Sequence, residues 1–186
     1  LVAVLEEITR KAPDYIPAWM RLGDLAYGQQ RYEHCDALAK KILARDPNHL
    51  DAMMLVGQVK LTKGEAAAAV VDYQKIASGY PNLPHILHKL AMAQLLNRDM
   101  SGAMASLNQA VKASPNYPEA VLLLAELSVR RGDPSAAIVL LNRLIQARPD
   151  LPKAHLLLAS AYAGRGNKDN AVAAYRKMAE LFPDNP

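Results

Sequence analysis

Six prolines recur along this chain at a constant interval of 34 residues, with no insertion or deletion between them. They are Pro13, Pro47, Pro81, Pro115, Pro149 and Pro183. A fixed period of this length is typical of stacked structural repeats, because one short repeat cannot bury its apolar face alone. The interval therefore predicts a solenoid rather than a single globular core. It also favours a surface for partners over a catalytic centre.

Apolar and small residues follow the same interval when Ile16 is numbered as position 1 of the first full repeat. Position 8 holds Gly23, Gly57, Ala91, Ala125 and Ala159, and position 20 holds Cys35, Ala69, Ala103, Ala137 and Ala171. Positions 7 and 27 are apolar in every full repeat. Spacings of 3, 4 and 7 between such rows indicate α-helices. We therefore expect two helices per repeat, which cross closely where the small side chains meet.

A turn between the two helices is predicted near position 15 of each repeat. Gly64, Gly132 and Gly166 occupy this position in three repeats, and Gly just past a helix end is a common stop signal. Gln30 and Arg98 occupy it in the other two repeats. We expect those two turns to have a different geometry.

Further signals predict where the second helix of each repeat begins and ends. Position 16 holds a capping residue in three repeats: Asp99, Asp133 and Asn167. Pro134 follows Asp133, and Pro is favoured at the first position of a helix. The periodic proline should end the helix, because it lacks an N–H and disfavours helix in the residue before it.

The interval also divides the chain into units. Residues 1–15 fit the second helix of a truncated repeat, and five repeats follow at 16–49, 50–83, 84–117, 118–151 and 152–186. This division predicts an all-α helix-turn-helix solenoid of about eleven antiparallel helices. The first unit is only half a repeat, and no polar capping helix follows the last one, so we expect one continuous solenoid cut from a longer array. Its uncapped ends should self-associate.

These residues resemble the tetratricopeptide repeat (TPR). The resemblance rests in the first two full repeats on Trp19, Leu22, Gly23, Pro47, Ala52, Gly57, Gly64, Ala69, Tyr73 and Pro81. It extends over the whole chain, and the repeat at 84–117 is the most divergent. The resemblance implies a right-handed superhelix of helix pairs, with the first helices on the concave side and the second helices on the convex side. It also implies a protein that binds other proteins.

In TPR arrays, ligands usually meet positions 2, 5, 9, 12 and 13 of the first helices. Carried over to this chain, these positions give a candidate peptide groove formed by Met20, Asp24, Tyr27, Met54, Gln58, Leu61, His85, His88, Met92, Leu95, Leu122, Glu126, Val129 and Leu156. Its middle would be apolar and rich in Met, with a mixed polar edge. Such a groove suits an amphipathic helix or an apolar peptide. The alternative is that these side chains pack between neighbouring helices, and that the array is a structural spacer or assembly module without a groove ligand.

One pair of histidines could bind a metal, and one cysteine could act as a reactive thiol. His85 and His88 lie three residues apart on one helix face, and Asp51 and Glu119 stand in the same groove row of the adjacent repeats. We favour solvated histidines at the edge of the groove, and we predict no metal and no cofactor. Cys35 replaces the Ala of its row, so we interpret it as a small packing residue.

The composition and the missing motifs argue against catalytic activity and against nucleic-acid binding. The net charge is only +4, and the basic residues Lys40, Lys41 and Arg45 are interleaved with acids, with no aromatic platform expected beside them. No phosphate loop, dinucleotide fingerprint, nucleophile elbow or paired-acid motif is present. No apolar stretch approaches the ~18 residues of a membrane span. We therefore predict a protein that is not an enzyme and does not bind nucleic acid.

Three segments are similar to a narrower group, the bacterial TPR lipoproteins associated with the PEP-CTERM protein-sorting and exopolysaccharide system. They are residues 90–95 (LAMAQL), 102–107 (GAMASL) and 125–134 (AELSVRRGDP). The resemblance implies a lipid-anchored scaffold in the bacterial envelope or periplasm. Without it, we would expect a cytoplasmic protein.

Overall fold

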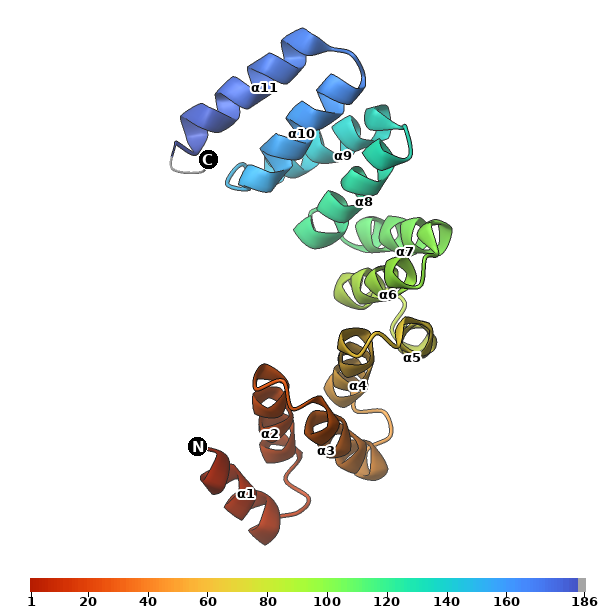
Figure 1. The fold of residues 1–186 in the computed structure, drawn as a ribbon, viewed down its shortest axis with the longest axis vertical. Coiled ribbons are helices and arrows are strands. Elements are labelled where there is room, and N and C mark those ends of the chain that lie inside the picture. The colour runs from red at the N-terminus through yellow and green to blue at the C-terminus, as the bar shows by residue number, and fades with distance from the viewer. Residues whose placement is uncertain (184–186) are drawn as a thin grey trace. The chain divides into compact units, whose positions relative to one another are not determined.

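The computed structural model describes residues 1–183, which form eleven α-helices and no strand (Figure 1). In chain order the helices are α1 (Val2–Lys11), α2 (Ile16–Gly28), α3 (Tyr32–Arg45), α4 (Leu50–Thr62), α5 (Ala66–Gly79), α6 (Pro84–Leu96), α7 (Met100–Ala113), α8 (Pro118–Arg130), α9 (Pro134–Ala147), α10 (Pro152–Gly164) and α11 (Lys168–Leu181). The all-α class and the eleven helices are confirmed. The last three residues of the predicted repeat 152–186 lie outside the described part. None of the described helices is long and apolar enough to cross a membrane.

The chain forms two compact units. Unit 1 comprises residues 1–81 and 92–99, and unit 2 comprises residues 82–91 and the chain from residue 100 onward. Helix α6 thus gives its first half to unit 2 and its second half to unit 1. Each unit is described separately below.

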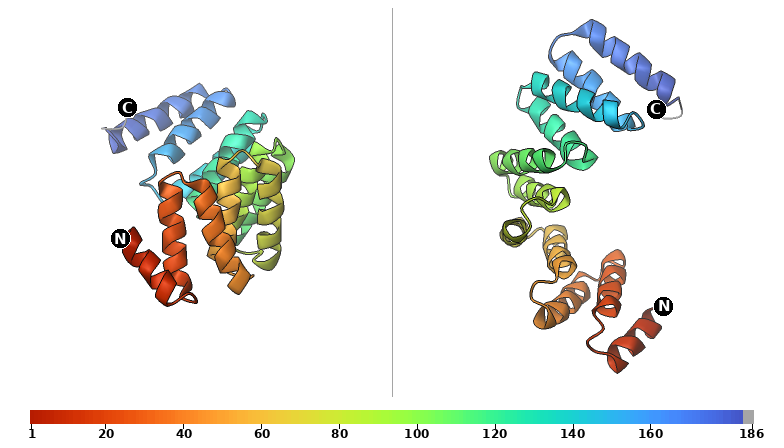
Figure 2. Two further views of the ribbon diagram at one scale, coloured as in Figure 1. Left: turned by 60° about the horizontal axis from the view of Figure 1, so that its bottom comes forward. Right: turned by 180° about the vertical axis from the view of Figure 1, so that it is seen from behind.

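Within each unit, a helix packs mainly on its neighbours in the chain. In unit 1, α1 to α5 contact one another in succession, and α2 also contacts α4. In unit 2, α7 to α11 do the same, and α8 also contacts α10 (Figure 2). The α2–α4 and α8–α10 contacts join the first helices of successive repeats. Side chains at equivalent positions of these helices therefore lie next to each other. Nearest-neighbour packing of this kind is the behaviour of a repeat array.

Small residues at position 8 allow the close approaches in unit 1. A Cβ added at Gly57 would lie 2.8 Å from Cζ of Tyr73, whose ring is fully buried in the same repeat. A Cβ added at Gly23 would lie 2.9 Å from Cδ2 of Leu55, in the next repeat. The predicted close crossing within a helix pair is therefore found at Gly57, whereas Gly23 serves the contact between two repeats.

All five turns within the repeats have the same geometry, and the separate geometry expected at Gln30 and Arg98 is wrong. The φ angles are 60° at Gln30 and 62° at Arg98, in the left-handed region also occupied by the three glycines, at 80° to 85°. In each turn, the N–H of position 16 donates to the carbonyl of position 11, for example Asp99 to Gln94 at 2.8 Å. The N–H of position 15 donates to the carbonyl of position 12. This pair of bonds is a Schellman motif. The backbone bonding pattern, and not the presence of Gly, fixes φ.

Helix ends elsewhere follow the predicted signals. Each of the six periodic prolines stands two residues after the end of a helix. The Asp133 carboxylate accepts from the N–H of Ala136 at 3.0 Å, and the Asn167 side chain accepts from the N–H of Asn170 at 3.2 Å. These side-chain bonds satisfy amides that the helix leaves unpaired. The helices therefore begin and end at the repeat positions that the sequence predicts.

Candidate peptide-binding surface

In unit 1, the predicted groove residues lie on three first helices. Helix α2 carries Met20, Asp24 and Tyr27, α4 carries Met54, Gln58 and Leu61, and the second half of α6 carries Met92 and Leu95. Asp24 and Met92 are exposed, and the other six side chains are partly buried. Helices α2 and α4 contact each other, so the predicted groove residues on the two helices form one surface. This surface is mainly apolar and is still reached by solvent.

Tyr27 links the first helices of two repeats in unit 1. Its hydroxyl lies 2.8 Å from Oγ1 of Thr62, in a hydrogen bond between the ends of α2 and α4. Its ring also packs edge-on against Tyr32, with 5.6 Å between the ring centroids. Tyr27 is therefore held in place before any ligand binds.

The polar edge of this surface contains a shallow pocket of about 300 Å³. It is lined by Ile16, Pro17, Met20, Arg21, Asp24, His49 and Asp51. The carboxylates of Asp24 and Asp51, both exposed, give this edge acidic groups beside the Met20 side chain. A basic side chain next to an apolar one would match this chemistry.

In unit 2, the predicted residues lie on the first half of α6 and on α8 and α10. His85 and His88 are on α6; Leu122, Glu126 and Val129 are on α8; and Leu156 is on α10. Leu156 is 46% exposed, and Leu122 is partly buried. Helices α8 and α10 contact each other, so Leu122, Val129 and Leu156 belong to adjacent rows.

One polar contact crosses between these two helices. The ammonium of Lys153 lies 3.9 Å from Oε2 of Glu126, and the two side chains are 63% and 40% exposed. An exposed pair at this distance contributes little stability, at most about 1 kcal/mol. Both groups therefore remain available to a charged ligand.

His85 and His88 differ in their surroundings, although they share a helix. His85 is more accessible, whereas the ring of His88 is partly buried and packs edge-on against Tyr117 with 6.1 Å between the centroids. Burial lowers the pKa of His88, the nearby Lys89 charge lowers it further, and Glu119 opposes the shift. Among residues 1–183, no three His, Cys, Asp or Glu side chains are grouped so that they could hold a metal ion.

Cys35 is fully buried in the helix pair formed by α2 and α3. Burial raises the pKa of its thiol to about 11, and the charges of Asp24 and Asp36 add to the effect. A reactive thiol needs exposure and a lowered pKa, and Cys35 has neither. Its environment is that of a packing residue.

Two ring N–H groups at position 4 have a role that the sequence analysis missed. Nε1 of Trp19 donates to the carbonyl of Pro13 at 2.8 Å, and Nε2 of His155 lies 3.0 Å from the carbonyl of Pro149. A carbonyl only accepts, so Nε2 of His155 carries the proton. Both rings thus bind the periodic proline six residues earlier. A residue with a ring N–H six positions after a periodic proline was the sequence signal that could have predicted this hydrogen bond.

Trp19 provides an aromatic platform beside the basic residues, which the sequence analysis did not expect. The ammonium of Lys41 lies 5.0 Å from the centre of the Trp19 ring, and Cζ of Arg45 lies 5.9 Å from it. Arg45 also approaches Asp14 at 3.4 Å, and Lys40 pairs with Asp36 at 2.6 Å. These basic side chains therefore have partners within the protein.

Comparisons with known proteins agree with this architecture. A family model described as tetratricopeptide repeat matches residues 94–161 and 129–186, which together span half of the chain, and a second model of the same description matches residues 16–49. No curated protein matches the sequence.

Solved structures similar to this chain are also TPR-like in fold. The crystal structure of MamA protein has a TM-score of 0.77 and 21% identity, covering 90% of this chain and 92% of that one. YrrB, described as a TPR protein with an unusual peptide-binding site, has a TM-score of 0.74 and 17% identity over 100% of this chain and 95% of that one. A thermophilic TPR protein of Thermus thermophilus has a TM-score of 0.66 and 22% identity over 91% of this chain and 93% of that one.

At these identities the solved structures show the fold alone, and the family models show membership. The periodic prolines, the Schellman turns and the small residues at position 8 agree with both comparisons. The chain therefore belongs to the tetratricopeptide repeat family.

Proposed function

We propose that this protein is an interaction scaffold that binds a peptide or helical segment of a partner along its first helices. The observation that carries the proposal is the set of apolar side chains at positions 5 and 12, several of which remain accessible on contacting first helices in each unit. Apolar anchors in adjacent rows are what an amphipathic helix or an apolar peptide needs. TPR proteins commonly bind protein partners, and the similar protein YrrB is described as having a peptide-binding site.

The polar residues of the same surface supply selectivity. In unit 1 the edge carries the carboxylates of Asp24 and Asp51, and in unit 2 it carries Glu126 beside Lys153. We infer that a ligand with an apolar stripe flanked by a basic side chain fits unit 1 best. Charged groups at such a rim steer and select partners more than they raise affinity.

The test is selection of amphipathic peptides from a displayed library, followed by affinity measurement with variants. Met54→Lys in unit 1 and Leu122→Lys in unit 2 should weaken binding of peptides selected on their own unit by at least about tenfold, because a charge would enter the apolar row. Matched controls are Val71→Lys on α5 and Val139→Lys on α9, which are 65% and 70% exposed on second helices. Circular dichroism should show that all four variants are folded.

The alternative, a spacer without a groove ligand, makes the opposite prediction. It predicts that no peptide is selected and that Met54→Lys and Leu122→Lys leave the function of the array intact. If peptides are selected but only Val71→Lys and Val139→Lys weaken their binding, the binding site lies on the second helices. Either result would contradict the proposed groove.

We propose a bacterial envelope setting, in PEP-CTERM protein sorting or exopolysaccharide export, on a separate basis. Its support is the similarity of residues 90–95, 102–107 and 125–134 to the TPR lipoproteins of that system. Cell fractionation of the full-length protein, with mass spectrometry for an N-terminal lipid, tests this setting. Recovery of unlipidated protein from the cytoplasmic fraction would contradict it and leave the groove proposal untouched.

A further inference from the structure

Position 4 of the first helix carries different side chains in the first two full repeats. In the first repeat this position holds Trp19, whose ring binds the Pro13 carbonyl and lies under the Lys41 ammonium. In the second repeat the equivalent residues are Met53, Pro47 and Lys75. The Met53 side chain has no N–H to donate and is narrower than the indole of Trp19.

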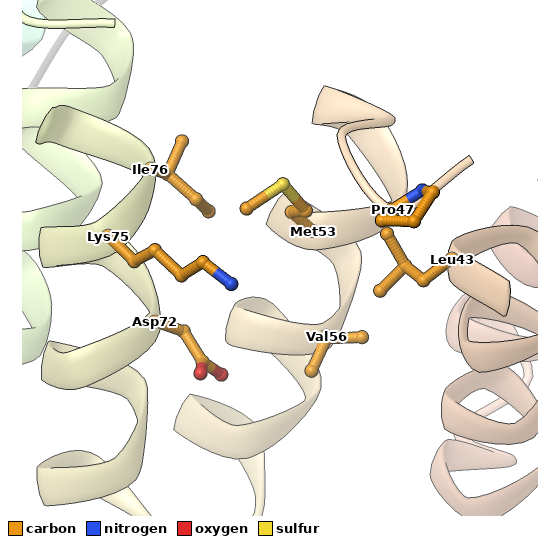
Figure 3. A pocket seen from close by; sticks show the side chains of 7 residues that line it. All are labelled: Leu43, Pro47, Met53, Val56, Asp72, Lys75 and Ile76. Atoms are coloured by element: carbon orange, nitrogen blue, oxygen red, sulfur yellow. The ribbon is translucent and has the colours of Figure 1, made fainter. Parts of the chain in front are cut away.

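A hollow of about 250 Å³ lies where the second repeat lacks this ring. It is lined by Leu43, Pro47, Met53, Val56, Asp72, Lys75 and Ile76 (Figure 3). All seven belong to unit 1 and come from α3, α4, α5 and the turn after α3. Three of the four elements of the Trp19 arrangement are thus repeated: the proline, the apolar walls and the lysine.

Charges at the rim favour an aromatic occupant. Asp72 is paired with Lys60 at 2.5 Å, so its charge is already compensated. Lys75 is exposed, forms no ion pair among the described residues, and points toward the space between α5 and α4 in Figure 3. An ammonium over an aromatic face is a favourable contact, and Lys41 already makes it with Trp19.

We propose that this hollow is a docking slot for a tryptophan side chain presented by a partner polypeptide. The argument for that occupant is internal: the protein itself places an indole in the equivalent slot of the first repeat. Pro47 and Lys75 are exposed at the mouth, so a ring can enter from solvent while its backbone stays outside. The slot uses residues distinct from those of the proposed groove, so the two proposals stand or fall separately.

The test uses a capped Gly-(5-fluoro-Trp)-Gly peptide and free 5-fluoroindole, both observed by ¹⁹F NMR. For so small a ligand we expect a dissociation constant on the order of 1 mM for the peptide. In protein with ¹³C-labelled methionine methyl groups, the peptide should shift the Met53 signal and leave the Met54 signal in place. This measurement needs no variant.

Variants then assign the slot. Met53→Trp should fill it and weaken peptide binding at least tenfold, and Lys75→Ala should weaken binding about two- to fivefold. Val139→Trp places the same ring on an exposed site of α9 in unit 2 and should leave binding unchanged. An unshifted Met53 signal at 10 mM peptide (~10 times the expected constant), unchanged binding to Met53→Trp, or binding of free 5-fluoroindole but not of the peptide would each overturn the proposal.

Discussion

At the scale of the residue, His88 is a predicted groove residue whose ring also packs inside its own repeat. The ring contacts Tyr117 and is partly buried, so its environment favours the neutral form. The pKa of His88 in the folded protein therefore lies below the ordinary value of 6.5. In the unfolded chain, the same group binds a proton more readily.

This difference predicts that acid destabilises the protein through His88. The unfolded state binds more protons than the folded state between the lowered pKa and 6.5, so the free energy of unfolding falls as pH decreases through that window. His88→Phe keeps a ring against Tyr117 and removes the titration. Urea unfolding at pH 7.5, 6.0 and 5.0 should show a smaller loss of stability for this variant. Equal losses in both proteins would contradict the assignment.

Position 4 shows how one residue can decide the local surface of a repeat. Trp19 and His155 reach the carbonyl of the preceding proline, whereas Leu87 and Val121 are buried apolar residues at the same position. Met53 neither donates to the proline nor fills the space beside it. The chemistry of each repeat therefore differs although its backbone does not.

At the scale of the element, the five turns within the repeats share one backbone shape with different residues. Gly fills the left-handed position in three turns without strain, whereas Gln30 and Arg98 adopt it at a cost of about 1 kcal/mol each. The two bonds of the Schellman motif form in every turn, so the geometry is enforced by the helix ends. Gly at this position helps the turn but is not required.

Substitutions at these turns should change stability in opposite directions. Arg98→Gly relieves the strain and should raise the free energy of unfolding by up to about 0.5 kcal/mol, after the greater entropy of Gly in the unfolded chain is counted. Gly132→Ala should lower it by about 1 kcal/mol, because φ is 85° and no atom lies near the added Cβ.

Gly28→Ala is the matched control for these turn variants. Gly28 also has open space around a Cβ, but it is helical and has no positive φ. This change should stabilise by up to about 1 kcal/mol. Thermal or urea unfolding measures all three, and a destabilised Arg98→Gly would refute the role assigned to the turn.

At the scale of the whole molecule, each unit is stabilised by contacts between successive helices, and the last helix presents an apolar face. Helix α11 packs on α10 and leaves Val172 and Tyr175 exposed, with Met178 partly exposed. In a repeat array, such a face is normally covered by another repeat or by a polar cap. A second copy of the chain offers apolar surface that could cover it.

We therefore predict that residues 1–186 self-associate at high concentration through α11. Tyr175→Lys should reduce the association constant at least about tenfold by placing a charge in the contact. Ala173→Lys is the matched control, since Ala173 is also exposed on α11 but lies two residues from Tyr175 and therefore on the opposite side of the helix. Sedimentation velocity over a concentration series measures both. A wild-type chain that stays monomeric throughout would contradict the prediction.

The sequence by itself determined the helix count, the helix ends and the place of each of residues 1–183 within its repeat, because these depend on local rules. A proline cannot continue a helix, small residues permit close crossing, and a period of 34 repeats both signals without interruption. The residues of the candidate groove were predicted from the same repeat positions. The identity of the ligand could not be predicted, because accessible side chains define the chemistry of a surface and not the partner that binds it.

Only the tertiary structure decided features that depend on contacts between segments. The left-handed turns at Gln30 and Arg98 follow from hydrogen bonds that both helix ends impose, and neither side chain signals them. The ring of Trp19 and the hollow beside Met53 each need several segments to converge on one proline. Such sites are set by packing between segments far apart in sequence, which residue types at one position do not specify.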